Sequence, residues 1–436
     1  MKPVKVGICG LGTVGSGTFN VLNRNQDIIA ARVGHPVIIE QVAVRHDNHA
    51  CDTSGTMVTR DIFDITRNPD IDIVVELIGG YETAKELILS AIEQGKHVVT
   101  ANKALIAEHG NEIFKAAKKH NVLVAYEAAV AGGIPIIKCL REGLAANRIH
   151  SLAGIINGTG NYILTEMGDK QRPFSDVLKE AQTLGYAESD PTFDIEGIDA
   201  CHKLTIMASI AFGIPLQFNQ AYTEGISLIT PLDIQYAEEL GYRIKHLGIA
   251  RRQEKGIEIR VHPALIPASK PMANINGVLN AIVVNSDALG QTLYTGPGAG
   301  SEATASSVIA DIMDIARTTQ SPEAAVPALG HIDEVPRFSE PVVPIEQIKT
   351  RYYLRIHAEN HPDRMNAMTD ILSTYGINVT AISQKSVANK EQYADIVIET
   401  GRFNEAVINR AIDSIESLTG VQAPVTRIRI ETTDSE

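Results

Sequence analysis

The middle of the chain contains a cluster of carboxylates followed by one lysine. In the segment DPTFDIEGIDACHK, residues 190–203, the acids are Asp190, Asp194, Glu196 and Asp199. Crowded carboxylates repel one another, so the cluster predicts a solvated loop, a metal site or a pocket for a cationic substrate. The spacing does not match a calcium-binding loop, and Pro191 interrupts it. We favour a pocket in which carboxylates bind an ammonium group and Lys203 protonates a carbonyl oxygen, with Asp190 and Glu196 left solvated.

A helix is predicted from Asp199 onward. Apolar residues recur there at spacings of three and four until Gly213 and Pro215 end the pattern. Asp199 and Lys203 then lie on one face of the helix, with roughly 5–6 Å between their Cβ atoms. A salt bridge worth about 0.3–0.5 kcal/mol would explain this pair by itself. It would leave the neighbouring acids, including Glu188, unexplained, so we interpret the pair as functional.

A glycine-rich loop follows the first predicted strand. The sequence VKVGICGLGTVGSG places three glycines in the G-x-G-x-x-G spacing between an apolar strand and a helix. Such glycines allow a tight turn, close approach of a pyrophosphate to backbone N–H groups, and close packing of helix on sheet. We therefore predict a dinucleotide site. Its residues are Gly10, Leu11, Gly12, Thr13, Val14 and Gly15.

The end of the second predicted strand, PVIIEQVAVR, indicates which dinucleotide is bound. Arg45 stands where an acidic residue would bind the ribose 2′-hydroxyl of NAD. Because an arginine can bind a 2′-phosphate, NADP is favoured, and NAD is the alternative. The competing explanation for Arg45 is an arginine that is simply solvated at the end of a strand.

Further strands alternate with helices through residues 1–134, which predicts an α/β fold with a Rossmann-type, doubly wound parallel sheet. Ligands of such sheets bind at the carboxyl ends of the strands. Gly79, and the segment from Thr100 to Lys103, stand at two of these ends. We assign them to the cofactor site, although Lys103 could instead be an ordinary surface lysine.

Length and composition exclude several classes of protein. At 436 residues the chain predicts two or three domains, and a formal net charge of −13 argues against a nucleic-acid partner. No apolar stretch has the length of a membrane span. The four cysteines are scattered, as expected of reduced thiols in the cytoplasm.

We divide the chain into four segments. Residues 1–134 form the dinucleotide-binding domain, and residues 135–302 form a mixed α+β domain for substrate binding, catalysis and dimerisation. Residues 303–348 contain a helix near 303–320 that packs back on the first domain, and then a linker. Residues 349–436 are predicted as strand, helix, strand, strand, helix and strand, which is the ferredoxin-like order.

The segments GIINGTGNYIL and EAQTLGYAESDPTFDIEGIDACHKLTIMA resemble the signature region of the homoserine dehydrogenases. The similarity runs from Val4 to the segment GPGAGSEATASSVIADI. It implies NAD(P)H-dependent reduction of L-aspartate 4-semialdehyde to L-homoserine, and the reverse, in threonine, methionine and isoleucine biosynthesis. It also implies that Lys203 is the proton donor. The other residues implied at the substrate are Glu188, Asp194, Asp199 and Lys103.

Two further loops resemble parts of the same family. YEAAVAGGIPII resembles its monovalent-cation loop, although the residues alone indicate only a strand end with a Gly-Gly turn. The implied ligands, most simply of a sodium ion, are Glu127, Val130, Gly132 and Ile134. The segment GPGAG, which ends at Gly300, resembles a second contact with the cofactor, and a flexible linker is its alternative. Gly185 is the last residue that we expect to contact the cofactor.

The C-terminal segment resembles an ACT domain, which implies an amino-acid effector and, in this family, L-threonine. Such domains usually have a Pro-Gly pair at the start of the first helix, whereas here Asp363 follows Pro362. A role in dimerisation or packing alone is the alternative. We also expect a homodimer or homotetramer.

Other functions compete with this one. A non-catalytic sensor of NADP or an amino acid would not need both Lys203 and the acid cluster, whereas another NADP oxidoreductase acting on a small amino acid would. An aspartate-semialdehyde dehydrogenase needs a catalytic cysteine beside a base. Cys201 and His202 are adjacent on the predicted helix and do not face each other, which argues against that enzyme.

Overall fold

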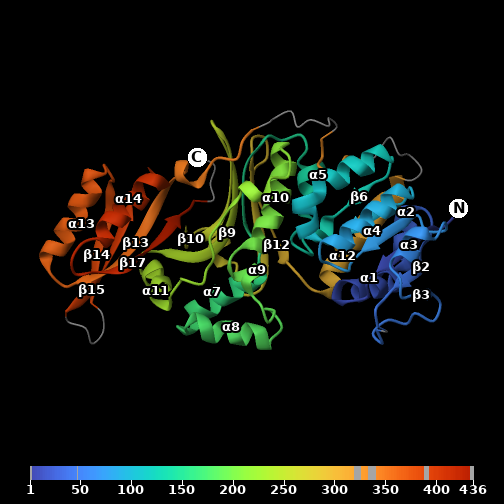
Figure 1. The fold of residues 1–436 in the computed structure, drawn as a ribbon, viewed down its shortest axis with the longest axis horizontal. Coiled ribbons are helices and arrows are strands. Elements are labelled where there is room, and N and C mark those ends of the chain that lie inside the picture. Colours follow the sequence, from blue (N-terminus) through green and yellow to red (C-terminus); the bar gives the residue numbers. More distant parts are fainter. Residues whose placement is uncertain (1, 47, 319–325, 332–339, 387–391, 433–436) are drawn as a thin grey trace. The chain divides into compact units, whose positions relative to one another are not determined.

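The computed structural model describes residues 2–46, 48–318, 326–331, 340–386 and 392–432 (Figure 1). The chain divides into two compact units. Unit 1 comprises residues 1–158, 199–221 and 278–340, and unit 2 comprises residues 159–198, 222–277 and 341–436. Residues 319–325 and 332–339, which belong to the predicted linker segment, lie outside the described residues.

Unit 1 contains a six-stranded parallel sheet with the order β3-β2-β1-β4-β5-β6. Its strands are β1 (Val4–Cys9), β2 (Val37–Ala43), β3 (Met57–Thr59), β4 (Ile73–Glu76), β5 (His97–Thr100) and β6 (Val124–Ala125). All four residues of β4 are fully buried, as expected of a strand covered on both faces. The predicted Rossmann-type sheet is confirmed.

Helices connect these strands. They are α1 (Thr13–Arg24), α2 (Gln26–Val33), α3 (Phe63–Arg67), α4 (Glu82–Glu93) and α5 (Lys103–Lys119). Helix α2 was not predicted, because its sequence QDIIAARV has no clear apolar stripe and buries only Ile29 and Val33. It follows α1 after Asn25, and Gly34 ends it in a left-handed conformation with φ of 92°.

Helix α12 (Ser301–Thr318) completes the core around β1 and β2. Its Val308 and Ile312 are fully buried in the same cluster as Val6 and Ile8 of β1. Helix α1 packs closely against α12, because a Cβ on Gly17 would lie only 2.5 Å from the carbonyl oxygen of Ser301. Figure 1 shows α12, near the end of unit 1 in sequence, beside the N-terminal helix α1.

Unit 1 also contains α6 (Ile136–Lys138), β7 (Ile149–Ile155), α10 (Ile198–Phe212), β11 (Leu279–Ser286) and β12 (Gly290–Pro297). Strand β11 pairs antiparallel with both β7 and β12. Helix α10 is the one predicted after Asp199. It ends as expected at Gly213, which has a φ of 69°.

Unit 2 begins with a helical part and a long hairpin. Its helices are α7 (Gly158–Lys170), α8 (Phe174–Thr183), α9 (Thr192–Ile195) and α11 (Pro231–Glu239). Strands β9 (Tyr242–Gln253) and β10 (Gly256–Pro267) pair antiparallel along their whole length. The two-residue strand β8 (Tyr222–Thr223) runs parallel to β10 at Arg260 and Val261.

The C-terminal part of unit 2 has the predicted βαββαβ order. Its elements are β13 (Lys349–Glu359), α13 (Pro362–Thr374), β14 (Val379–Ser386), β15 (Tyr393–Thr400), β16 (Phe403–Asn404), α14 (Glu405–Glu416) and β17 (Val421–Ile430). The sheet order β17-β13-β15-β14 is ferredoxin-like. Strand β17 also pairs in parallel with β10, through Ala264↔Arg429 and Leu265↔Ile430.

Candidate active site

A buried carboxylate, Asp199, lies between two lysines in unit 1. The Lys203 ammonium donates to Asp199 Oδ2 at 2.7 Å, and the Lys103 ammonium lies 3.0 Å from Asp199 Oδ1. Lys203 also donates to the carbonyl oxygen of Ile156 at 2.8 Å. The structure therefore brings together three of the predicted catalytic residues, from the starts of α5 and α10.

Several contacts keep Asp199 ionised. Burial alone would raise the pKa of its carboxyl group, but the positive charges of Lys203 and Lys103 outweigh this effect. Asn157 also donates to Asp199 Oδ2 at 2.9 Å, and the pKa of Asp199 is held well below its usual range. The sequence did not single out Asn157 as a site residue, although it belongs to the quoted motif GIINGTGN.

Helix α10 contacts α5 through a second polar group. His202 Nε2 lies 3.4 Å from Glu108 Oε1, and the imidazole packs on Phe218 with 4.3 Å between ring centroids. Burial lowers the pKa of His202, against the opposing effects of Glu108 and Asp199. Burial and a hydrogen bond to Glu108 together raise the pKa of Tyr81 to about 12. Glu108 thus joins α10 to the residue before α4, a role that no sequence pattern indicated.

The glycine-rich loop between β1 and α1 has the geometry that a dinucleotide requires. Gly10 has a φ of 97°, and a Cβ at Gly15 would overlap the carbonyl oxygen of Gly10. At Gly12, by contrast, a Cβ would meet no atom within 4 Å. Helix α1 begins at Thr13, so its free N–H groups face this open backbone. The loop therefore fits a pyrophosphate group.

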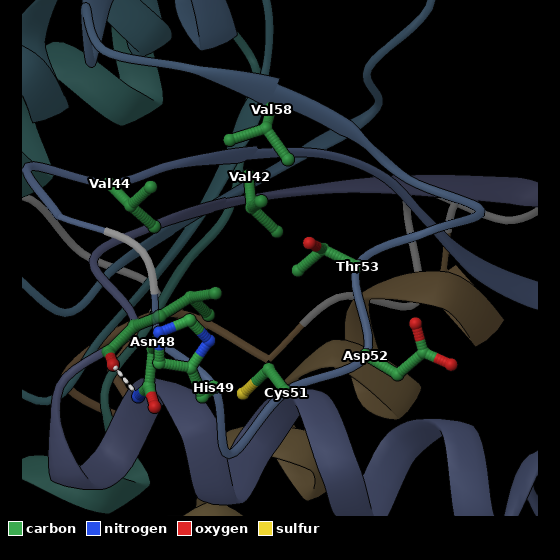
Figure 2. A pocket seen from close by; sticks show the side chains of 9 residues that line it. Val42, Val44, Asn48, His49, Cys51, Asp52, Thr53 and Val58 are labelled. Atoms are coloured by element: carbon green, nitrogen blue, oxygen red, sulfur yellow. Dashed lines mark hydrogen bonds between the residues drawn. The ribbon is translucent and has the colours of Figure 1, made fainter.

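A cavity of about 470 Å³ lies beyond this loop, at the carboxyl end of β2 (Figure 2). Its lining residues are Leu11, Val42, Val44, Asn48, His49, Cys51, Asp52, Thr53 and Val58. Asn48 donates to the carbonyl oxygen of Leu11 at 2.6 Å, which ties the cavity to the glycine-rich loop. Arg45 directly follows the lining residue Val44 and is exposed. The cavity has the place expected for the adenosine part of a dinucleotide.

The loop after β4 is held by the carboxylate of Glu76. Glu76 accepts hydrogen bonds from the N–H groups of Ile78 and Gly79, at 2.9 and 3.0 Å, and from Thr100 at 2.6 Å. Asn102 donates to the carbonyl oxygen of Gly80 at 2.7 Å. The predicted residues Gly79, Thr100 and Lys103 therefore share one edge of the sheet, and Glu76 is a supporting residue that the sequence did not reveal.

The turn predicted to bind a cation contains two buried carboxylates. Glu127 accepts from the N–H groups of Ile137 and Lys138, at 2.9 and 2.7 Å, and its own N–H donates to Asp311 at 2.7 Å. Burial raises the pKa of Glu127 to about 7, and burial together with Glu127 raises the pKa of Asp311 well above its usual value. Asp311, on α12, was not predicted.

The predicted residues in that turn lie against the second glycine-rich segment. Ser307 donates to the Gly132 carbonyl oxygen at 2.6 Å, and the N–H of Gly133 donates to the carbonyl oxygen of Pro297 at 3.1 Å. Val130 and Ile134 are both buried. Gly300 directly precedes α12, whose Ser301 donates to the carbonyl oxygen of Thr13 at 2.7 Å. Gly300 thus lies beside the first glycine-rich loop.

The remaining predicted site residues belong to unit 2. Gly185 and Glu188 are exposed in the loop after α8, and Asp194 is half-buried in α9. Asp190 is exposed and accepts from Thr192, as expected of a solvated acid. Glu196 is half-buried and accepts from the Ser227 hydroxyl at 3.0 Å, so it is less exposed than Asp190.

Comparison with known proteins identifies the family. The model for homoserine dehydrogenase matches residues 135–313, and the model for the homoserine dehydrogenase NAD-binding domain matches residues 10–127. The chain is 60% identical to the homoserine dehydrogenase of Pseudomonas aeruginosa and 51% identical to that of Neisseria gonorrhoeae, over 99% of each chain. The chain belongs to the homoserine dehydrogenase family. It is therefore an oxidoreductase that interconverts L-homoserine and L-aspartate 4-semialdehyde, an enzyme of amino-acid biosynthesis.

Solved homoserine dehydrogenases have the same fold. The structure of the enzyme from Thiobacillus denitrificans is 55% identical, covers 99% of both chains and gives a TM-score of 0.94. A hyperthermophilic archaeal homoserine dehydrogenase in complex with NADPH is 26% identical, covers 72% of this chain and gives a TM-score of 0.62. Among the described helices of this chain, none is both long and apolar enough to span a membrane.

Proposed function

We propose that Lys203 is the general acid and base of the homoserine dehydrogenase reaction. A dinucleotide held by the glycine-rich loop would supply, from its nicotinamide, the hydride that reduces the aldehyde carbon. Negative charge then develops on the carbonyl oxygen, where the Lys203 ammonium stabilises it and delivers a proton. The observation that carries this proposal is the 2.7 Å contact between Lys203 and ionised Asp199, which fixes the position of the ammonium.

The other site residues have supporting roles in this proposal. Lys103, 3.0 Å from Asp199, adds a second positive charge beside the reacting oxygen. Asp199 holds both lysines and contacts the substrate. Glu188 binds the substrate's α-ammonium group, and Asp194 is a further residue at the substrate. In homoserine oxidation Lys203 must accept a proton, so the oxidation rate is expected to rise toward alkaline pH.

The test is an assay of homoserine oxidation, followed by the absorbance of the reduced nicotinamide, with Lys203→Met compared with wild type. Loss of a general acid and base predicts a fall in kcat of about 100-fold or more, with NADPH binding unchanged. Lys119→Met, at an exposed position in α5 of the same unit, is the matched control. A Lys203→Met enzyme with wild-type kcat, or a wild-type oxidation rate independent of pH, would contradict the assignment.

NADP is the proposed cofactor. Arg45 follows the cavity residue Val44 and offers a guanidinium to a 2′-phosphate. Asp52, however, lines the same cavity, and a carboxylate there would favour the 2′-hydroxyl of NAD. Figure 2 shows the Asp52 carboxylate directed away from Val42 and Val44, which argues against Asp52 as the ribose contact. Arg45→Ala is expected to raise the KM for NADP and leave the KM for NAD unchanged, whereas Asp52→Ala is expected to change neither.

A monovalent cation, most simply sodium, is proposed at the turn of Glu127, Val130, Gly132 and Ile134. The support is electrostatic, because two buried carboxylates, Glu127 and Asp311, have raised pKa values and a nearby cation would stabilise their charged forms. The ion would hold the turn in place and take no part in the chemistry. Thermal stability is therefore expected to increase with sodium chloride more than with choline chloride at equal ionic strength.

For the ferredoxin-like domain we propose the role of an ACT domain that binds L-threonine. The support is its strand order together with the resemblance of its sequence. At the start of α13, His361 accepts from the N–H of Asp363 at 3.3 Å, so a carboxylate stands at the expected entrance for an amino acid. Dehydrogenase rates unchanged by millimolar threonine would contradict this role.

We also propose that the protein is a homodimer or homotetramer and that it is located in the cytoplasm. All four cysteines are free thiols, which agrees with a reducing compartment.

A further inference from the structure

Unit 2 contains a cluster of buried and partly buried charges that the reaction does not use. We call it the Glu224 cluster, and its members are Tyr222, Glu224, Glu405, Arg427 and Arg429. Glu224 Oε2 accepts from Arg429 Nη1 at 2.9 Å, from Arg427 Nη2 at 3.1 Å and from the Tyr222 hydroxyl at 2.7 Å. Glu405 accepts from Arg429 Nε at 2.8 Å and lies 3.0 Å from Arg427 Nη1.

The formal charges of the cluster cancel. Two arginines face two glutamates, and the side chain of Arg429 is fully buried, as is almost all of Glu405. In such a site each charge depends on the others, because loss of one partner leaves a buried charge without compensation. The arginines belong to β17 of the C-terminal domain, whereas Glu224 follows β8, at the edge of the hairpin formed by β9 and β10.

The segment that starts at Glu224 supports the loop of α9. The N–H of Ile226 donates to the carbonyl oxygen of Ile195 at 2.9 Å, and the Ser227 hydroxyl donates to Glu196 at 3.0 Å. Gly225 permits this close contact, because a Cβ there would lie 2.7 Å from the carbonyl oxygen of Ile195. Residues 224–227 therefore contact the loop that carries Asp194, and we call these four residues the platform.

The platform is fixed to the hairpin as well. The N–H of Glu224 donates to the carbonyl oxygen of Val261 at 2.8 Å, and His246 Nε2 donates to the carbonyl oxygen of Glu224 at 3.0 Å. The Glu224 side chain is the platform's charged contact with Arg427 and Arg429 of β17. Ile226 of the platform also shares an apolar cluster with Ile428 and Ile430 of β17, so a change at β17 can reach the α9 loop through the carboxylate and through this apolar packing.

We propose that Glu224, held by Arg427 and Arg429, is a positioning residue that sets the conformation of the α9 loop and thereby the substrate contacts of Asp194. The C-terminal domain then has a part in substrate binding whether or not it binds an effector. This inference rests on the proposed role of Asp194 at the substrate, and the experiment separates the two.

Glu224→Gln in the full-length enzyme tests the inference, with Gly225→Ala as a second variant that displaces the platform without altering the ion cluster. For both, the KM for homoserine is expected to rise about tenfold, while kcat changes less than about threefold. The KM for NADP is expected to stay unchanged, because the glycine-rich loop belongs to unit 1. A merely structural defect would raise both KM values and lower kcat together.

Tyr242→Phe is the matched control. It removes another hydrogen bond between the hairpin and the C-terminal domain, from the Tyr242 hydroxyl to Glu399 at 3.3 Å, and should leave all constants unchanged. An unchanged homoserine KM in both Glu224→Gln and Gly225→Ala, beside a raised one in Asp194→Asn, overturns the positioning role and leaves the proposed function intact. An unchanged homoserine KM in Asp194→Asn overturns the proposed role of Asp194, and this inference with it.

Discussion

The charges around Asp199 do not cancel. One carboxylate contacts two ammonium groups, at 2.7 and 3.0 Å, so the group of three carries one net positive charge. A negative charge that develops on a substrate oxygen beside Lys203 is therefore met by an excess of positive charge. The pKa of Asp199 is held well below its usual range by the charges of Lys203 and Lys103, so the carboxylate remains ionised in the neutral range.

His246 is expected to make the protein sensitive to acid. Burial lowers its pKa to about 4, and its Nδ1 has no hydrogen-bond partner in the part of the chain that the structure describes. The unfolded chain binds a proton near pH 6.5, whereas the folded protein resists it until about pH 4. The contribution to stability is complete above pH 6.5 and is lost as the pH falls toward 4, by about 3 kcal/mol at most.

Thermal unfolding between pH 7 and pH 4 measures this effect. The midpoint should fall with acidification in the wild type and fall less steeply in His246→Gln, whose amide can still donate to the carbonyl oxygen of Glu224. His150→Gln, at an exposed position, is the control and should follow the wild type. Equal slopes for wild type and His246→Gln would show that another group dominates the acid transition.

At the scale of elements, the glycine-rich loop could be predicted because three glycines at fixed spacing satisfy a backbone requirement that is local in sequence. Helix α10 could be predicted for the same reason, from its apolar spacing and from Gly213. Helix α2 could not, since only two of its residues are buried and α12 covers much of the neighbouring core. Glu108 and Asp311 were also missed, because their partners are distant in sequence and only folding brings them together.

Substitutions at two glycines of the loop are expected to have different effects on stability and on cofactor binding. Gly15→Ala should lower the unfolding temperature and abolish NADP binding, because the new Cβ would overlap the Gly10 carbonyl oxygen. Gly12→Ala should leave the unfolding temperature unchanged, since its Cβ meets no protein atom within 4 Å, yet weaken NADP binding by occupying the space of the pyrophosphate. Calorimetry and NADPH fluorescence distinguish the two, and equal loss of stability in both variants would contradict this account.

At the scale of the whole molecule, the order of helices and strands along the chain could be predicted. The assignment of separate chain segments to two compact units could not. Hydrophobic periodicity reports which face of an element is buried and carries no information about the element that buries it. The division into residues 1–134, 135–302, 303–348 and 349–436 therefore stays a prediction about domains. The compact units each combine three separate parts of the chain.

Removal of residues 341–436 is expected to leave an insoluble protein. Tyr353, Val397, Ile428 and Ile430 share a buried cluster with residues of α7, α8 and α11, and truncation would expose the apolar surface that they cover. The measurement is the soluble fraction after expression, and co-expression of residues 341–436 as a separate chain should restore it. A truncated chain that is soluble and oxidises homoserine would contradict the prediction.

The position of α12 also determines when the protein can finish folding during synthesis. The strands of the nucleotide-binding sheet leave the ribosome early, but the helix that covers Val6 and Ile8 begins only at Ser301. At a translation rate of roughly 5–20 residues per second, on the order of ten seconds pass between synthesis of the sheet and synthesis of α12. We expect chaperones to bind the exposed apolar face of the sheet during that interval.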